Sequence, residues 1–491
     1  MSQLSTSKLV RLLGTFSSEE IKSFLLWLKS PWANSNKNLI RLLEQLRKFH
    51  PSFELGRLDK ESLFRKVIPH GTYSARSMNN LLSEAFLSAE RFLVFERVAN
   101  EKNLQERLLA EELQKRQLTD WFSKKVGASI EKLEKQPVKA WEDYLDLFLL
   151  YRMVNFHPSQ SGNYKIPANV LDLMQQTLDL VFLLETGSII NEKIFRSRIK
   201  RHEEYQIDHS MGIWKALKAS YDHPSLHFFM DRFSYDEEAF LEQFFQLRDQ
   251  FVEKFNKLNL RDQKIHLQSL FNDGSLLTRS GQIGISELLP LYQLGLERQL
   301  LQQDGILPPT IFATVVSASN TASSFKYTLD FINEFAEELP INLRTEARSW
   351  GLAHTAYWEK NYDKCLAILL AQPVKSLYFN LLTRVLNTQV YFDLFLQDSS
   401  YGDFLFNFFD AFEKWLQREK HRAKFNKSSF LRFIQLSRSL ARLYMKADFD
   451  DKSVSALLKN EDNVQASNWL RQKQALVIQL RKGTARPERF H

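Results

Sequence analysis

The chain has few of the residues that bend or cross-link a backbone. It contains 15 glycines, 13 prolines and one cysteine in 491 residues. Average proteins hold about 7% glycine and about 5% proline, so backbone turns that need either residue are scarce here. A β-protein would need a turn roughly every 8–12 residues, and the shortage therefore favours long helices. The single cysteine, Cys365, excludes an intramolecular disulfide and any zinc site built from several cysteines.

Targeting and membrane-spanning segments are also missing. The first five residues, MSQLS, lack the basic and apolar regions of a signal peptide. No stretch approaches the roughly 18 uncharged apolar residues that a membrane span requires. We therefore expect a cytoplasmic protein that has no membrane partner.

Phenylalanine is abundant, with 39 residues, which we interpret as aromatic bulk filling narrow seams between helices. The first strong helix signal is a predicted capping box formed by Ser17 and Glu20. One apolar face follows at helical spacing: Ile21, Phe24, Leu25 and Leu28. Similar signals predict a helix that begins after Asn34 or Asn36, another that begins after Asp59, and one long helix over residues 74–98.

The second half of the chain repeats one apolar pattern three times. Each copy begins with an aromatic residue, Phe325, Tyr362 or Tyr401, followed by apolar residues four and seven positions later. The copies are spaced by 37 and 39 residues. These spacings fit a two-helix repeat with loops of slightly variable length.

The middle copy resembles a tetratricopeptide repeat. Ala353 and Cys365 occupy the two small-residue positions, where small side chains let paired helices approach closely. Ala356 stands where the motif has a tyrosine, Lys360 where it has the turn glycine, and the closing proline falls early. The pattern favours helical hairpins more strongly than it favours this particular repeat.

The sequence therefore predicts an all-α fold, with an N-terminal helical module followed by an α-solenoid of degenerate tetratricopeptide-like hairpins. The predicted parts are the module at 1–100, connecting helices at 101–156, a linker at 157–167, the solenoid at 168–446, clearest over 308–420, and a covering helix with a basic tail at 447–491. We expect the covering helix to lie on the apolar face of the last repeat, because a solenoid end must be shielded from water.

Two stretches carry a resemblance to a known family. One combines LLGTFSSEE at 12–20 with SPWANSNK at 30–37, and the other combines the Tyr362 copy with FDAFEKWL at 409–416. Together they resemble a large family of helical proteins of the Bacteroidota that has no established activity. The resemblance covers nearly the whole chain. It implies a bacterial, cytoplasmic helical-repeat protein and brings no catalytic residue, cofactor or substrate with it.

Motifs that carry chemistry are not found. The sequence contains no glycine-rich phosphate loop, no H-E-x-x-H and no G-x-S-x-G. The closest metal-like spacing is His223 and His227, but Pro224 is predicted to begin the helix and leaves His223 outside it. Acidic pairs such as Glu337 and Glu338 fit a charged helix surface. We therefore predict no enzyme, no metal and no cofactor.

Charge is concentrated in one segment. Residues 414–446 contain ten lysines and arginines but only one acid, Glu419. This segment alone could account for the net charge of +8 that the whole chain carries. Its candidate contacts to nucleic acid or an acidic partner are Lys414, Arg418, Arg422, Lys424, Lys427, Arg432, Arg438 and Arg442. Such a stripe would neutralise phosphates in a salt-sensitive way. The alternative interpretation is a solvated helix face.

The leading functional hypothesis is a protein-interaction scaffold, because stacked helix pairs form an extended surface for a protein or peptide partner. The alternative is nucleic-acid binding through residues 414–446. An enzyme with a new helical active site is the third class, and no residue in the sequence supports it.

Overall fold

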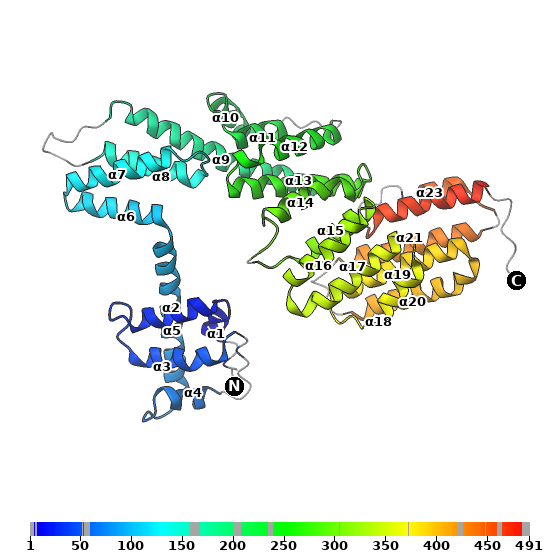
Figure 1. Cartoon of the computed structure of the whole chain (residues 1–491), viewed down its shortest axis with the longest axis horizontal. Coiled ribbons are helices and arrows are strands. Elements are labelled where there is room, and N and C mark those ends of the chain that lie inside the picture. The colour runs from blue at the N-terminus through cyan, green and yellow to red at the C-terminus, as the bar shows by residue number, and fades with distance from the viewer. Residues whose placement is uncertain are drawn as a thin grey trace. The chain divides into compact units, whose positions relative to one another are not determined.

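The computed structural model describes the chain as a set of helices (Figure 1). The described residues are 4, 7–51, 53, 59–157, 167–199, 208–233, 239–303, 305–371, 373–419, 426–446, 448–458 and 464–483. Within these ranges there is no β-strand, only an isolated bridge between Gln303 and Ile306. The predicted all-α fold is confirmed. Among the described helices, none has the length and apolar character needed to span a bilayer.

The chain forms two compact units. Unit 1 contains Met1–Pro137 and Glu142–Leu178, and unit 2 contains Val138–Trp141 and Asp179–His491. Helix α9 (Val170–Ile199) begins in unit 1 and ends in unit 2. The predicted linker lies almost entirely outside the described residues, as does the basic tail. The predicted domain boundaries therefore stay predictions.

Unit 1 builds its helices around two apolar cores. Its elements before α9 are α1 (Lys8–Leu13), α2 (Ser18–Lys29), α3 (Lys37–Leu46), the 3-10 helix η2 (Arg47–Phe49), α4 (Lys60–Val67), α5 (Ala75–Asn100), α6 (Lys102–Lys115), α7 (Thr119–Glu134) and α8 (Trp141–Asn155). One core joins α1 to α5 and includes Phe24 and Phe92, whose ring centroids lie 5.1 Å apart. The other core joins α6, α7 and α8 around Phe122.

The helix starts in unit 1 follow the predicted capping chemistry. The Ser17 hydroxyl accepts a hydrogen bond from the Glu20 amide at 3.1 Å, and the Glu20 carboxylate accepts one from the Ser17 amide at 2.6 Å. This capping box satisfies two amides that a helix start leaves unpaired. Asn36 and Asp59 cap α3 and α4 in the predicted places, and α5 begins at Ala75.

In the residues that the structure describes, unit 2 continues from the second part of α9 through a series of helices. They are α10 (Asp208–Lys218), α11 (Pro224–Phe233), α12 (Phe240–Lys254), η3 (Phe255–Lys257), α13 (Leu260–Ser280), η4 (Ile285–Leu288), α14 (Leu289–Glu297), α15 (Pro309–Thr321), α16 (Phe325–Phe335), η5 (Ala336–Glu338), η6 (Ile341–Leu343), α17 (Arg344–Trp358), α18 (Tyr362–Ala371), α19 (Leu377–Gln397), η7 (Ser399–Tyr401), α20 (Gly402–Arg418), α21 (Lys427–Met445), α22 (Asp451–Ala456) and α23 (Ser467–Gly483). One continuous apolar core runs from Phe228 to Val477.

The helices from α15 to α20 pack as three consecutive pairs. Each of α15, α17 and α19 contacts the helix that follows it, and α17 also contacts both α15 and α19. Phe325 and Tyr362, which begin two of the repeated sequence patterns, are the first residues of α16 and α18. The third pattern is displaced by one residue, because Tyr401 ends η7 and α20 begins at Gly402. The repeated patterns thus mark the second helix of each pair.

Two of these pairs turn through the same backbone conformation. Lys360 after α17 and Ser323 after α15 have φ angles of 63° and 57°. The following amides, of Asn361 and Ser324, each donate to a carbonyl five residues earlier at 2.9 Å. This is the Schellman end of a helix, where glycine is usual because a left-handed backbone strains other residues. Lys360 therefore adopts a left-handed conformation in which glycine is the usual residue.

Helix α23 covers more of unit 2 than the sequence predicted. It packs against α21 and α22, as expected for a helix that shields the chain's last helices, but it also reaches α13. The Trp469 ring contacts the rings of Phe392 on α19 and Phe433 on α21. Its indole nitrogen donates to the Tyr357 hydroxyl on α17 at 2.8 Å. Helix α23 therefore covers parts of α13, α17 and α19 as well as the last helices of the chain.

Candidate functional site

The basic segment forms the paired helices α20 and α21, which pack against each other. Lys414 and Arg418 are exposed on α20, and Arg432 and Arg442 are exposed on α21. Lys427 begins α21 and is partly buried, whereas Arg422 and Lys424 lie outside the described residues. The described cations therefore sit on two neighbouring helices.

Arg438 is engaged inside this helix pair. Its guanidinium donates to Asp410 at 2.8 Å and to Glu413 at 3.0 Å, and lies 5.7 Å from the centre of the Phe409 ring. The two carboxylates come from α20, so Arg438 joins α21 to α20. A phosphate would have to compete with both acids for this side chain.

The histidine pair is separated by the start of a helix. Pro224 begins α11, as predicted, and the His223 ring nitrogen Nδ1 accepts a hydrogen bond from the Ser225 amide at 3.2 Å. His227 instead lies 2.6 Å from the Asp222 carboxylate. Within the described ranges, no three histidine, cysteine, aspartate or glutamate side chains are grouped so that they could hold a metal ion.

A buried polar cluster joins α11 to α13, and no motif in the sequence predicts it. The Ser225 hydroxyl donates to the Asp262 carboxylate, which also accepts from the Asn259 amide at 2.9 Å. Ser225 has no exposed surface. A nucleophilic serine needs a histidine as its base and access to substrate. Ser225 has neither, because its proton goes to a carboxylate inside the core.

Further along the same two helices, about two turns on in α11, α11 and α13 share a buried ion pair. Arg232 donates to both oxygens of Asp273, with one of the two contacts at 3.0 Å, and both side chains are about 1% exposed. His266 packs against the rings of Phe228 and Phe229 at 4.1 and 4.9 Å. Burial, together with the nearby Arg232 charge, lowers the pKa of His266 to about 3. These groups lie inside the core of unit 2, where a substrate does not reach them.

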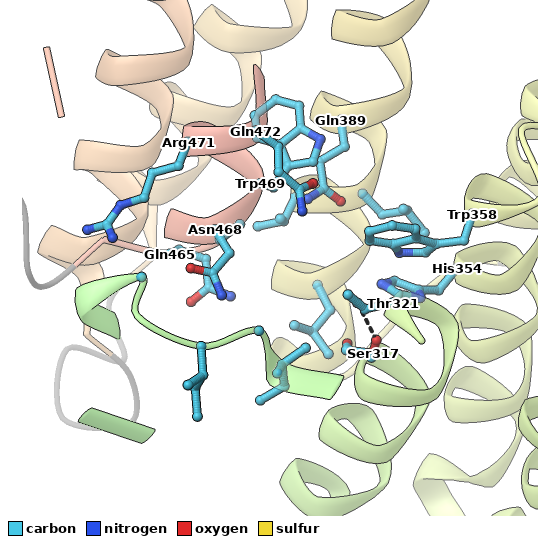
Figure 2. Close-up of a pocket in the computed structure, with 18 of the residues that line it drawn as sticks. Ser317, Thr321, His354, Trp358, Gln389, Gln465, Asn468, Trp469, Arg471 and Gln472 are labelled. Carbon is cyan, nitrogen blue, oxygen red and sulfur yellow. Dashed lines mark hydrogen bonds between the residues drawn. The ribbon is translucent and has the colours of Figure 1, made fainter. Parts of the chain in front are cut away.

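Unit 2 contains a cavity of about 450 Å³ beside α23 (Figure 2). Its walls come from the loop after α13 and from α15, α17, α19 and α23. Aromatic and polar side chains line it, among them Trp350, His354, Trp358, Gln389, Asn468 and Gln472. Pockets of about 300–1,000 Å³ are typical of ligand sites.

Three residues of α17 form one wall of this cavity. Trp350, His354 and Trp358 are spaced by four residues, which places them on one helix face. The His354 ring lies between the two indoles, with centroids 5.0 and 6.4 Å away. Asn320 donates to His354 Nδ1 at 2.9 Å, which leaves the proton on Nε2. Burial lowers the pKa of His354 to about 3, so the ring is a neutral donor.

The opposite walls carry side-chain amides. Gln389 of α19 is 9% exposed and makes no hydrogen bond with any residue that the structure describes. Asn468 and Gln472 project from α23 toward the same space (Figure 2). Arg471 donates to the carbonyls of Ser280 and Arg279 at 2.5 and 3.2 Å.

No carboxylate is among the described side chains that line the cavity. The site therefore offers neutral donors, neutral acceptors and indole surface. Such a lining can bind and orient a polar molecule, but it supplies no ionised acid or base for proton transfer. Cys365 lies outside the cavity, and burial raises the pKa of its thiol to about 12, which disfavours a nucleophilic role.

Unit 1 carries a separate apolar groove between α2 and α5. Trp27 and Phe92 lie along it, and Leu26, Trp32 and Phe95 form its exposed edges. Trp32 is 99% exposed. Large apolar side chains that face water in a group are typical of surfaces that contact other molecules.

The sequence contained weak signals for the cavity. The spacing of Trp350, His354 and Trp358 marks one helix face, but a buried aromatic face is the commoner meaning of that pattern. Gln389 gave no signal, because only its unpaired burial distinguishes it. No protein-family model matches this chain, and no characterised protein or solved structure is significantly similar to it.

Proposed function

We propose that this chain is a non-enzymatic scaffold that binds another protein or a peptide through the helical surface of unit 2. In this proposal the pairs α15–α16, α17–α18 and α19–α20 are degenerate tetratricopeptide-like hairpins of an α-solenoid. Their order of contacts supports it, because the first helix of each pair neighbours the first helix of the next. The family resemblance to helical-repeat proteins of the Bacteroidota points in the same direction.

The observation that carries the proposal is the seating of α23. This helix comes from the end of the chain, and it buries Trp469, Leu470 and Val477 against helices that precede it. An amphipathic helix laid against a helical surface is one of the recurring modes of peptide recognition. The surface of unit 2 thus already holds one helical segment of the chain, and the cavity beside that segment is where we place the partner.

Affinity capture tests the proposal. The tagged chain, a Trp358→Ser variant of the cavity wall and a Trp121→Ser control are each incubated with extract of the organism that encodes the chain. Trp121 is 66% exposed on α7 of unit 1, so the control removes an indole outside the cavity. We expect mass spectrometry to find the same captured protein with the wild type and with the control. The amount of that protein captured by the Trp358→Ser variant should be several-fold lower. Recovery of no reproducible protein across growth conditions would contradict the proposal.

Nucleic-acid binding through α20 and α21 is the second candidate. Lys414 and Arg418 are four residues apart on α20, so both lie on one exposed face beside α21. Their contacts to phosphates would be strongest at low salt, so labelled DNA and RNA should be titrated at roughly 50 mM and roughly 200 mM salt.

A charge-reversal pair makes this titration specific. Lys414→Glu/Arg418→Glu removes the proposed contacts, and Lys124→Glu/Lys125→Glu makes the same change of net charge on α7. The candidate predicts weaker binding for the first pair alone. Equal loss in both variants, or no affinity at roughly 50 mM salt, would exclude it.

A further inference from the structure

The side-chain amide of Gln389, on α19, lines the cavity. The side chain of Gln389 is 9% exposed and has no hydrogen-bond partner among the described residues. A buried polar group without a partner costs free energy, so such groups in folded proteins usually have a bound partner. Gln389 lines the cavity, so a ligand within the cavity would reach this amide and could pair with it (Figure 2).

Two more amides line the same space from α23. Asn468 and Gln472 are four residues apart, which in a helix is a rise of about 6 Å along one face. An extended peptide presents equivalent main-chain groups every second residue, about 6.6 Å apart. Each side-chain amide both donates and accepts, as each peptide unit does. The two amides therefore match the repeat of an extended main chain.

The remaining walls supply neutral donors and apolar surface. The proton of His354 lies on Nε2, because Nδ1 accepts from Asn320. The Trp350 indole nitrogen is buried without a partner among the described residues. The indole of Trp358 adds a flat apolar surface to the same wall. Apolar side chains or rings of a ligand would pack on such surfaces.

Charge does not dominate the site. The lining contains no carboxylate among its described residues, and the one guanidinium, of Arg471, is engaged by two backbone carbonyls at the end of α13. A ligand recognised here is therefore held by neutral hydrogen bonds and ring packing. The main chain of a peptide fits this chemistry better than a phosphate or a cation does.

We propose that this cavity binds a short extended segment of a partner protein by its main chain. The amides of Asn468 and Gln472 pair with alternate peptide units along α23, Gln389 pairs with the segment from the opposite wall, and an apolar side chain packs on Trp358. This inference rests on the scaffold function proposed above and specifies its ligand. Helix α23 then has two roles, since it covers the core and also provides half of the binding site.

A peptide library tests the proposal without knowledge of the partner. The full chain is screened against random N-acetylated hexapeptide amides, and selected peptides are measured by fluorescence polarisation. We expect Asn468→Ala/Gln472→Ala and Gln389→Ala each to weaken binding roughly tenfold or more, through lost hydrogen bonds. Gln479→Ala is the matched control, because Gln479 is exposed on α23 outside the cavity.

N-methylation of the peptide tests main-chain recognition directly. Each N-methyl group removes one main-chain amide donor from the peptide. We expect methylation at every second peptide position to abolish binding, and methylation at the positions between them to leave binding unchanged. Asn468 and Gln472 are partly or fully exposed, so their variant should fold normally even if Gln389→Ala does not. The proposal is overturned if the screen yields no peptide, or if every selected peptide binds the Asn468→Ala/Gln472→Ala variant as it binds the wild type.

The failures of the two proposals are distinguishable. If affinity capture recovers a partner that depends on Trp358 but the library and methylation results are negative, the scaffold stands and the main-chain mode is wrong. If capture also recovers nothing, both are wrong.

Discussion

Lys473 of α23 forms a buried ion pair with Asp393 of α19, with side chains that are 10% and 4% exposed. The Asp393 carboxylate also accepts hydrogen bonds from the hydroxyls of Tyr357 at 2.8 Å and Tyr362 at 3.3 Å. Burial raises the pKa of Tyr357, and the Asp393 charge raises it further. One carboxylate thus joins α17, α18, α19 and α23, and it fixes the helix that carries one wall of the cavity.

We predict that Lys473→Met releases α23 from unit 2. The variant leaves the Asp393 carboxylate buried without a counter-ion, which typically costs about 3–5 kcal/mol. Hydrogen exchange of the α23 amides should rise strongly. Lys482→Met is the control, because Lys482 also lies on α23 and pairs with Asp451 of α22, but it is 64% exposed, where an ion pair contributes about 0–1 kcal/mol. Equal protection in the two variants would show that the buried pair does not hold α23.

We predict that Ser323→Gly stabilises unit 2. Ser323 is exposed and holds a φ of 57°, which glycine adopts without steric strain, so the gain should be about 0.5–1 kcal/mol. Lys360→Gly should gain less, because the Lys360 ammonium lies 5.8 Å from the Tyr357 ring and that attraction is lost. Urea denaturation measures both.

The matched control for these turns is Lys364→Gly. Lys364 is exposed within α18, where glycine costs about 1 kcal/mol. Stabilisation by glycine at position 364, or destabilisation at position 323, would contradict the assigned backbone conformations.

We predict that His266 makes unit 2 sensitive to acid. Its pKa falls to about 3 in the folded protein, against about 6.5 in the unfolded chain. The folded state therefore favours the neutral ring, and stability that is complete above pH 6.5 is lost as the pH falls toward 3. Each pH unit within this window costs about 1.4 kcal/mol for one such group.

The His266→Leu variant isolates that contribution. Neither ring nitrogen of His266 has a partner among the described residues, so the substitution should leave stability at pH 7 unchanged or raise it. Urea denaturation at pH 7 and pH 5 should show a smaller acid loss in the variant than in the wild type. Some loss should remain, because the pKa of His354 is also lowered to about 3. The same loss in both proteins would refute the role of His266.

We predict that Cys365 resists alkylation in the native protein. The side chain has no exposed surface, and burial raises the pKa of its thiol to about 12, so thiolate is scarce at neutral pH. Iodoacetamide should modify the chain only after denaturation, as read by intact mass. Rapid modification of the native chain would contradict the packing of α18.

The sequence predicted the local features of the fold well. Ser17, Asn36 and Asp59 begin helices because capping depends on residues within one turn of each other. Phe325 and Tyr362 are the first residues of α16 and α18. Their spacing of 37 residues is the length of one helix pair with its loops, so the repeat could be read from the sequence. The repeat label and the scaffold role stay predictions.

Pairings between distant residues could not be predicted. Arg232 and Asp273 are 41 positions apart. Charged residues in helices usually lie on the surface, so the sequence predicts an exposed position for both. Arg438 was assigned to a basic contact surface, but it meets acids 25 and 28 positions earlier on the neighbouring helix. The cavity depends on the same kind of pairing, because Gln389 faces Asn468 only after α23 packs onto the preceding helices.

Site-specific photo-crosslinking in cells tests the central claim, that a protein partner binds unit 2 beside α23, most directly. Benzoylphenylalanine is placed at Gln472 in the cavity wall and, in a separate variant, at Leu370, which is 81% exposed on α18 outside the cavity. We predict one discrete protein adduct from position 472 and none of that mass from position 370. Adducts of equal yield from both positions, or none from position 472, would contradict the claim.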